Sequence, residues 1–328
     1  MLGAIRVTTA IEHTEPRAGI MARLGAYLGE RFPLLGNGLL ILSFYSSNQF
    51  LAHALNEPGH PMKYDLTTLC GFLTILCFFL HMRIFDDHKD YNEDLHFFPN
   101  RVLQSGKVTL RELKFVAAAA IGVQIASSAI VGPTAMLSWA IAFFFSVLML
   151  KEFFVRNWLK QRFLLYASVH MLIMPLLAMV VWSFATRRFF WQAPPWYWLY
   201  SMVGFLLAFN WEVSRKIRVP EDEREGLDSY SRLFGTYGAA YLVLAIRVVD
   251  TVLVTWVAYH LGLSIWFYLL LVLLFLVCLV GFFQYRFRTS TATAKRLGVY
   301  AGFYIVAFDV ALAIELGRKF GIGWSGTF

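Results

Sequence analysis

The sequence predicts an all-α membrane protein, and three observations lead to that fold class. Hydrophobic residues make up 58% of the 328 residues and charged residues only 15%, whereas soluble domains average about 45–50% and about 25%. The apolar residues gather in nine long segments. The lysines and arginines lie mostly in alternate connections between those segments. This composition excludes a disordered chain, and the mean hydropathy of +0.58 argues against a water-soluble domain.

Each apolar segment has about the length of a helix that crosses a bilayer, which needs roughly 20 mostly apolar residues. Backbone groups cannot stay unpaired in lipid, so we expect helices rather than loops in these spans. The segments do not suit a barrel of short alternating strands. The predicted spans are residues 33–55, 67–85, 115–131, 134–154, 164–186, 196–211, 237–260, 265–285 and 297–316.

The distribution of lysine and arginine predicts the orientation in the membrane. With the N-terminus inside, most of the 29 basic residues fall on that same side. We therefore expect an integral protein of the inner or plasma membrane, with a cytoplasmic N-terminus and the C-terminus on the opposite side. The net charge of +8 then faces anionic headgroups and cytosol. It does not indicate a nucleic-acid partner; the lipid bilayer is the expected one.

Two regions are expected along the chain. Residues 1–31 are mixed in character and contain no long apolar core of the kind found in a signal peptide. They are predicted to form a cytoplasmic or interfacial N-terminal segment. No linker or low-complexity tract divides the remainder, so residues 32–328 are predicted to be a single helical membrane domain.

About half of the 21 acidic residues lie in two short segments, 86–94 and 212–228, on the predicted cytoplasmic side. Asp86, Asp90 and Asp94 are spaced four apart, so they would share one helix face if the second span continued beyond the membrane. Carboxylates crowded in this way repel unless a cation neutralises them, and they suit Mg²⁺. The alternative is a solvated acidic helix end.

In this segment the sequence resembles the UbiA-type intramembrane prenyltransferase superfamily. The family pattern is Asn-Asp-x-x-Asp-x-x-x-Asp, a spacer, and Arg-Pro-x-x-Ser-Gly. Asp86 stands at the Asn position, and Asp90 and Asp94 stand at the two metal-binding aspartates. The remaining matching positions are Asp87, Arg101, Ser105 and Gly106. The resemblance implies a UbiA-like bundle of nine transmembrane helices with a cap of cytoplasmic loops.

The second family motif, Asp-x-x-x-Asp after the sixth span, is matched with a departure. Residues 226–235 fit the later part of the motif, which places Asp222 at its second aspartate and Arg218 at its first. A gapped match supplies Glu212 as the missing acid instead. We expect Glu212 and Asp222 to be the ligands of this motif.

The resemblance implies an isoprenyl diphosphate substrate, with Mg²⁺ ions that neutralise its leaving group. The implied catalytic and metal-binding residues are Asp86, Asp90, Asp94, Glu212 and Asp222. Basic residues suit phosphate contact, and buried polar residues could line the cavity or serve packing. The implied substrate-binding residues are Arg101, Lys107, Lys151, Arg215, Lys216, Arg218, His170 and Asn210. Aromatic candidates near the mouth of the bundle are Tyr166, Phe209, Trp211 and Tyr230, and the sequence favours none of them over the others.

Charged residues also lie inside the predicted spans. Arg247 and Asp250 are three apart on span seven, and Asp309 is in the middle of span nine. Charges within a membrane are costly and often functional. They could form a structural ion pair, or an aspartate could deprotonate a carbocation or orient an acceptor.

Three functions remain open from the sequence. The first is a prenyltransferase that joins the isoprenyl chain to an aromatic or other lipophilic acceptor. The second is a UbiA-type terpene cyclase, in which the cation reacts with its own double bonds; the departures at Asp86 and Arg218 favour it. The third is a transporter, for which polar sites at the membrane midplane are typical. Only the charges within spans seven and nine fit that third function.

Overall fold

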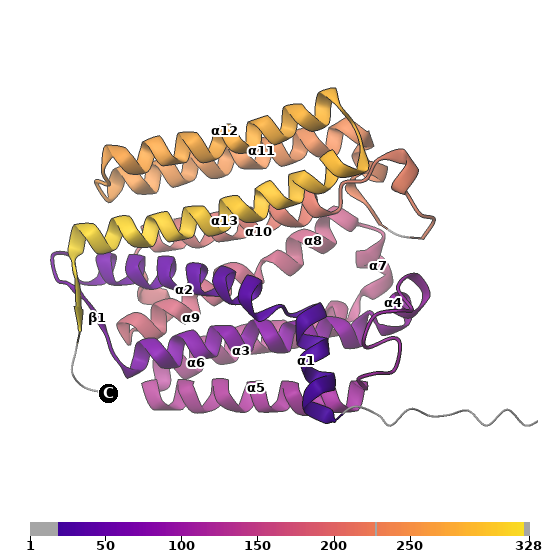
Figure 1. Cartoon of the computed structure of the whole chain (residues 1–328). Coiled ribbons are helices and arrows are strands. Elements are labelled where there is room, and N and C mark those ends of the chain that lie inside the picture. Colours follow the sequence, from indigo (N-terminus) through magenta and orange to yellow (C-terminus); the bar gives the residue numbers. More distant parts are fainter. Residues whose placement is uncertain (1–18, 227, 325–328) are drawn as a thin grey trace, which may run out of the picture.

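The computed structural model describes residues 19–226 and 228–324, and these are almost entirely helical (Figure 1). The α-helices are α1 (Ile20–Arg31), α2 (Leu34–Asn56), α3 (Leu66–Lys89), α4 (Tyr91–Phe97), α5 (Leu110–Val131), α6 (Pro133–Leu150), α7 (Arg156–Lys160), α8 (Phe163–Met171), α9 (Ile173–Thr186), α10 (Pro195–Arg215), α11 (Tyr230–His260), α12 (Ile265–Phe287) and α13 (Thr291–Phe320). The shorter elements are η1 (Glu152–Phe154), η2 (Phe190–Gln192), η3 (Pro220–Asp222), β1 (Met62–Tyr64) and β2 (Ile322–Trp324). This confirms the all-α class.

Every predicted span coincides with a helix, and the fifth is divided into α8 and α9. Among the described residues, seven helical segments are long and apolar enough to cross a membrane: α3, α5, α6, α8 with α9, α11, α12 and α13. The other two predicted spans correspond to α2 and α10, which are not among these seven. The polar residues of α2 face the protein interior, since Ser43, Ser47, Asn48 and Gln49 are all buried. A count of nine crossings therefore stays a prediction.

Several helices extend beyond the predicted spans because polar residues cap them. Thr109 and Glu112 form a capping box that starts α5 five residues before the expected span. Ser290 caps α13 in the same way. The fourth span instead ends early, at Leu150, because residues 152–154 turn into a left-handed conformation. Apolar composition marks the membrane-embedded part of a helix, while its caps set its ends.

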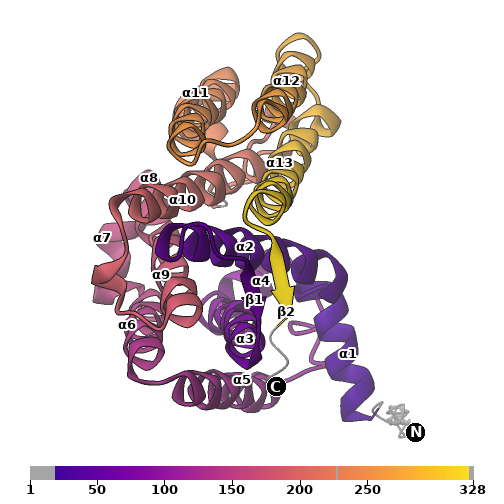
Figure 2. The same cartoon turned by 90° about the vertical axis from the view of Figure 1, so that its left-hand side faces the viewer.

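The helices pack as a bundle around α2. Figures 1 and 2 show α11 and α12 as a layer beside α10 and α13, with α2 between that layer and α3. In addition, α2 packs against α9 and α13, and α3 packs against α5. The helices run side by side, so their ends lie at two opposite ends of the bundle.

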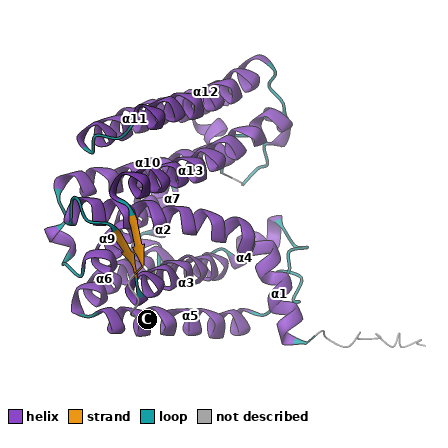
Figure 3. Cartoon of the chain, turned by 60° about the vertical axis from the view of Figure 1, so that its left-hand side comes forward, coloured by secondary structure: helices purple, strands orange, loops and turns teal. Residues whose placement is uncertain are grey.

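The two ends of the bundle carry different connections. One end, which we call the loop end, holds α1, α4, α7 and the α10–α11 loop (Figure 1). At the opposite end β1 and β2 form a parallel pair, with Met62 opposite Ile322 (Figure 3). The connections predicted to be cytoplasmic thus gather at the loop end. Residues 1–18 of the predicted N-terminal segment lie outside the described residues, and which end faces the cytoplasm stays a prediction.

Buried polar contacts link the helices, and they include the partners of the charged residues within the predicted spans. Arg247 donates from Nη1 to Asp250 Oδ2 at 3.0 Å, which confirms the structural ion pair. Asp309 is not ion-paired with it. Its Oδ1 accepts hydrogen bonds from Ser47 at 2.7 Å and from Tyr200 at 3.1 Å. These contacts join α2, α10 and α13 through the Asp309 carboxylate.

Candidate active site

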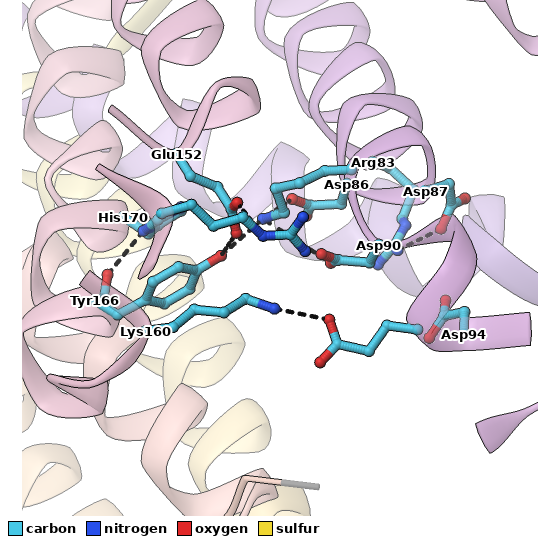
Figure 4. Close-up of polar contacts among 12 residues, drawn as sticks. Arg83, Asp86, Asp87, Asp90, Asp94, Glu152, Lys160, Tyr166 and His170 are labelled. Atoms are coloured by element: carbon cyan, nitrogen blue, oxygen red, sulfur yellow. Dashed lines mark hydrogen bonds and ion pairs between the residues drawn. The ribbon is translucent and has the colours of Figure 1, made fainter. Parts of the chain in front are cut away.

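The first acidic segment bends at Asp90. Helix α3 ends at Lys89, and Asp90 separates it from α4. The guanidinium of Arg31 contacts both Asp87 and Asp94, which places those two carboxylates on one side. The condition for a shared helix face, an uninterrupted helix from Asp86 to Asp94, is not met, because α3 ends at Lys89 and α4 begins at Tyr91. Figure 4 shows Asp94 apart from Asp86 and Asp90. Within the described part of the chain, no group of three His, Cys, Asp or Glu side chains is arranged to hold a metal ion.

Asp87 is enclosed by side chains with which it forms ion pairs and a hydrogen bond. Its side chain is fully buried and lies 2.5 Å from both Arg31 Nη2 and Arg83 Nη2. Tyr27 of α1 donates a hydrogen bond to its Oδ2 at 2.6 Å. Burial, and the neighbouring Asp87 carboxylate, raise the pKa of Tyr27, so this phenol stays protonated as a donor. Asp87 thus fastens α1 to the end of α3.

Asp94 is likewise engaged by cations. Arg101, the arginine of the first motif, lies 2.6 Å from Asp94 Oδ2, and Arg31 lies 3.4 Å from the same atom. The Arg101 guanidinium also stacks over the Phe98 ring at 3.8 Å. Arg101 therefore lies next to the first acidic segment, as predicted, with its charge directed at Asp94.

Asp86 and Asp90 flank the ammonium group of Lys89. Lys89 Nζ lies 3.2 Å from Asp86 Oδ1 and 3.9 Å from Asp90 Oδ2. It also donates to the Tyr166 hydroxyl of α8 at 3.1 Å. The lysine side chain is only 8% exposed, whereas the Asp86 and Asp90 side chains are 44% and 36% exposed. The two carboxylates can therefore still accept a ligand from the loop end.

The Asp90 carboxyl is partly buried and lies among other acids, and both conditions disfavour its charged form. Burial raises its pKa to about 6, and the opposing effect of Lys89 does not offset it. The nearby carboxylates of Asp86, Glu93 and Asp94 act in the same direction as burial. A further cation at this position would relieve the repulsion between these acids.

Helix α8 faces these carboxylates with an aromatic pair. The His170 ring stacks on Tyr166 with centroids 4.1 Å apart. His170 Nδ1 lies 2.7 Å from the Tyr166 carbonyl oxygen, so Nδ1 carries the proton and donates. The other ring nitrogen, Nε2, is buried without a partner among the described residues. Figure 4 shows the pair beside Glu152, facing Asp86 and Asp90.

Two residues at this site were missed by the sequence interpretation. Lys89 stands at an unspecified position of the first family motif, so the sequence assigned it no role. Glu152 is buried in η1, ion-paired with Arg156 at 2.7 Å and 3.5 Å from the Tyr166 hydroxyl. The backbone of residues 152–154 has φ angles of 48°, 54° and 59°, a conformation that costs free energy in non-glycine residues. An acid inside the predicted span 134–154 was the available signal for Glu152.

In the second acidic segment, basic side chains of the same segment lie next to Glu212. Glu212 is buried at the end of α10, with Lys216 Nζ 2.7 Å from Oε1 and Arg215 Nε 2.6 Å from Oε2. Asp222 in η3 accepts a hydrogen bond from Thr291 at 2.5 Å. One guanidinium nitrogen of Arg218 is buried and has no partner within the described residues. This motif therefore combines one shielded acid with a group of basic side chains.

The two acidic segments converge around α8. Lys89 of α3 donates a hydrogen bond to the Tyr166 hydroxyl of α8 at 3.1 Å, and α10, which carries Glu212, packs against α8. Lys216 Nζ lies 5.0 Å from the centre of the Phe163 ring, at the start of α8. The predicted first and second motifs thus border one region of the loop end.

The remaining candidates lie elsewhere. Lys107 and Lys151 are exposed residues in connections at the loop end. The Asn210 side chain donates to the Val243 carbonyl at 2.7 Å and accepts from Arg247 at 2.9 Å. Its amide is used in helix packing, the alternative that the sequence had left open.

Residues 41–306 match the UbiA prenyltransferase family. The chain belongs to this family. No curated protein gave a significant match. The resemblance seen in the first motif is thereby confirmed over most of the chain.

Solved structures of low sequence identity share the fold. One, of digeranylgeranylglyceryl phosphate synthase, is 18% identical with a TM-score of 0.61, covering 91% of this chain and 100% of that one. An apo UbiA homologue from Aeropyrum pernix K1 is 16% identical with a TM-score of 0.66, covering 84% and 97%. A UbiA homologue from Archaeoglobus fulgidus bound to GPP and Mg²⁺ is 14% identical with a TM-score of 0.55, covering 88% and 99%.

Proposed function

We propose that this UbiA-family protein ionises an isoprenyl diphosphate within the membrane and transfers the prenyl group to an aromatic or other lipophilic acceptor. The observation that carries the proposal is the convergence of two acidic segments and their basic neighbours around α8, where Lys89 contacts Tyr166 and Lys216 contacts Phe163. Support also comes from the related Archaeoglobus fulgidus protein, which was solved with GPP and Mg²⁺ and with DMAPP and Mg²⁺. The loop end is proposed to face the cytoplasm, with the C-terminus on the opposite side.

The carboxylates of Asp86 and Asp90 fit a magnesium ion. Both are partly exposed, and because burial and neighbouring acids raise the pKa of Asp90, a bound cation would favour its charged form. Oxygen ligands of this kind, with the remaining positions filled by water and substrate phosphate, are what Mg²⁺ prefers. When bound, Mg²⁺ would supply charge neutralisation for the departing diphosphate. Asp94 and Glu212 are held by two cations each and would serve as supporting acids.

Basic side chains of the second motif would bind the diphosphate oxygens. Arg215 and Lys216 are 50% and 29% exposed, so their charges can reach a ligand while Glu212 orients them. The breaking C–O bond would leave its electron pair on the diphosphate, where these cations stabilise the developing charge. The ring faces of Tyr166 and His170 border the same region and would stabilise the allylic cation.

The acceptor nucleophile would then donate an electron pair to the cation and lose a proton. A terpene cyclase is the second candidate, because Arg218 stands where the family motif has an aspartate. In that reaction the electron pair comes from a double bond of the same chain. Both functions share the ionisation step and the same diphosphate site.

One experiment tests both functions. The full chain is purified in lipid nanodiscs and incubated with Mg²⁺ and geranyl, farnesyl or geranylgeranyl diphosphate, first without and then with lipophilic phenol acceptors. Diphosphate release and the prenyl products are measured. A coupled product formed only with acceptor supports the transferase, and a cyclic hydrocarbon or alcohol without acceptor supports the cyclase. No release from any substrate would contradict both.

A further inference from the structure

The connection between α6 and α8 joins two helices that can cross a membrane. Helix α6 ends at Leu150, and the next candidate membrane helix begins at Phe163. Residues 151–162 therefore lie where both helices reach the surface of the bilayer. Figure 2 shows α7, which belongs to this connection, at the outer margin of the bundle. Side chains that point outward from this connection are at the level of the lipid headgroups.

The inner side of this connection is fixed to the bundle. Glu152 is buried and pairs with Arg156 at 2.7 Å. Leu159 is buried as well, and Lys160 pairs with Glu93 of α4 at 2.9 Å. These contacts hold the connection in one orientation, so the side chains on its other side form a surface that exists before any ligand binds.

The outer side combines exposed aromatic rings with arginines. Phe154 and Trp158 are 76% and 49% exposed. The guanidinium of Arg162 stacks over the Trp158 ring at 4.3 Å, and its Nη1 donates to the Trp158 carbonyl at 3.0 Å. The Arg156 side chain is 51% exposed, although its Nε contacts Glu152. Tryptophan is typical of the membrane interface, where its ring lies at the level of the headgroups.

The charge of this connection suits an anionic headgroup. Residues 151–162 contain four basic residues and one acid, which is the buried Glu152. Among the described residues, no carboxylate pairs with Arg162. A guanidinium binds phosphate oxygens through two parallel hydrogen bonds, and basic clusters beside a membrane helix attract anionic lipids.

We infer that residues 151–162 bind the headgroups of anionic phospholipids, with Arg156 and Arg162 contacting the phosphate groups. The occupant is the bilayer around the chain, because the positive charge lies between two membrane helices and beside an exposed tryptophan. This inference does not depend on the proposed function, since lipid binding is measured without a diphosphate substrate.

The test compares two lipids that differ only in the headgroup. The full chain in detergent micelles is titrated with phosphatidylglycerol or with phosphatidylcholine of the same acyl chains, and bound lipids are counted by native mass spectrometry. We expect phosphatidylglycerol to bind about tenfold more tightly. Arg156→Gln/Arg162→Gln should remove most of this preference and leave phosphatidylcholine binding unchanged. Arg162→Gln alone keeps the ion pair of Glu152 and should lower the preference about threefold.

Arg288→Gln/Arg296→Gln is the matched control, because it removes the same charge. Both arginines are exposed at or near the α12–α13 connection. Within the described part of the chain, neither of them stacks on a tryptophan. This variant should keep the wild-type preference. Thermal unfolding establishes that each variant is folded, and the wild-type comparison and Arg162→Gln still test the inference if the loss of Arg156 prevents folding.

Several outcomes would overturn the inference. One is equal affinity of the wild-type chain for the two lipids, and another is an unchanged preference in folded Arg156→Gln/Arg162→Gln. An equal loss in the control variant would show that net charge, and not this connection, determines lipid binding. A dimer that the Arg156→Gln/Arg162→Gln variant dissociates, without a preference for phosphatidylglycerol, would assign this surface to a second copy of the chain.

Discussion

Replacing Asp87 by asparagine should destabilise the protein, although Asp87 belongs to the predicted metal-binding motif. The carboxylate is fully buried and contacts Arg31 and Arg83, which are 13% and 29% exposed. Tyr27 donates to it as well. Removing one partner of a buried ion pair costs about 3–5 kcal/mol. Because both arginines retain some access to water, we expect the lower end of that range, about 3 kcal/mol.

Asp86→Asn is the matched control, one residue earlier in the same helix. Its side chain is 44% exposed, and its ion pair is with Lys89 at 3.2 Å. Lys89 keeps Asp90 and Tyr166 as partners after the change. Removing a partly exposed pair costs about 0.2–1 kcal/mol, so this variant should remain stable while it loses diphosphate release.

The two variants are compared by chemical unfolding in mixed micelles and by diphosphate release in nanodiscs. The free energy of unfolding should fall by about 3 kcal/mol for Asp87→Asn and by less than about 1 kcal/mol for Asp86→Asn. Equal stability of Asp87→Asn and wild type, combined with lost Mg²⁺ binding, would refute the reasoning. That result would indicate that Asp87 is a metal ligand and that its contacts around Arg31 contribute little to stability.

Three further predictions concern activity. Asp90→Asn should reduce diphosphate release by about 10²-fold or more, because the cation loses one of its two accessible carboxylates; near-normal release would remove the argument for a metal site. Glu212→Gln should raise KM for the diphosphate about tenfold with little change in kcat, since Arg215 and Lys216 lose the acid that orients them; this costs about 1.4 kcal/mol of binding, and unchanged KM would exclude Glu212 from the site. Chelation of divalent ions with EDTA should stop diphosphate release and added Mg²⁺ should restore it, whereas turnover in EDTA would argue that basic side chains alone suffice.

The membrane helices could be predicted from the sequence because their signal is local. Twenty or so apolar residues in a row specify a helix wherever they occur, since lipid leaves the backbone no other partner. The early start of α5 is also local, because Thr109 and Glu112 cap it within one turn. The first motif was recognised for the same reason, since it is contained within the 21 residues from Asp86 to Gly106.

The partners of the acids could not be predicted in this way. Arg31 and Asp87 are 56 residues apart in the sequence, and Lys89 and Tyr166 are 77 residues apart. Such contacts depend on how α1, α3 and α8 pack, which the spacing of charges does not encode. The bend at Asp90 was missed because the four-residue spacing of the aspartates is that of an uninterrupted helix. The expected shared face depended on that continuity.

The bend divides the four acids of the first motif into two pairs with different tasks. Asp87 and Asp94 turn toward Arg31, where they join α1 to the ends of α3 and α4. Asp86 and Asp90 turn toward Lys89 and the loop end. The four aspartates among the five acids of residues 86–94 would repel strongly on one face, and this division places a cation beside each pair. An acid-rich motif can therefore be stable before any metal binds, because only Asp86 and Asp90 are left accessible to the ligand.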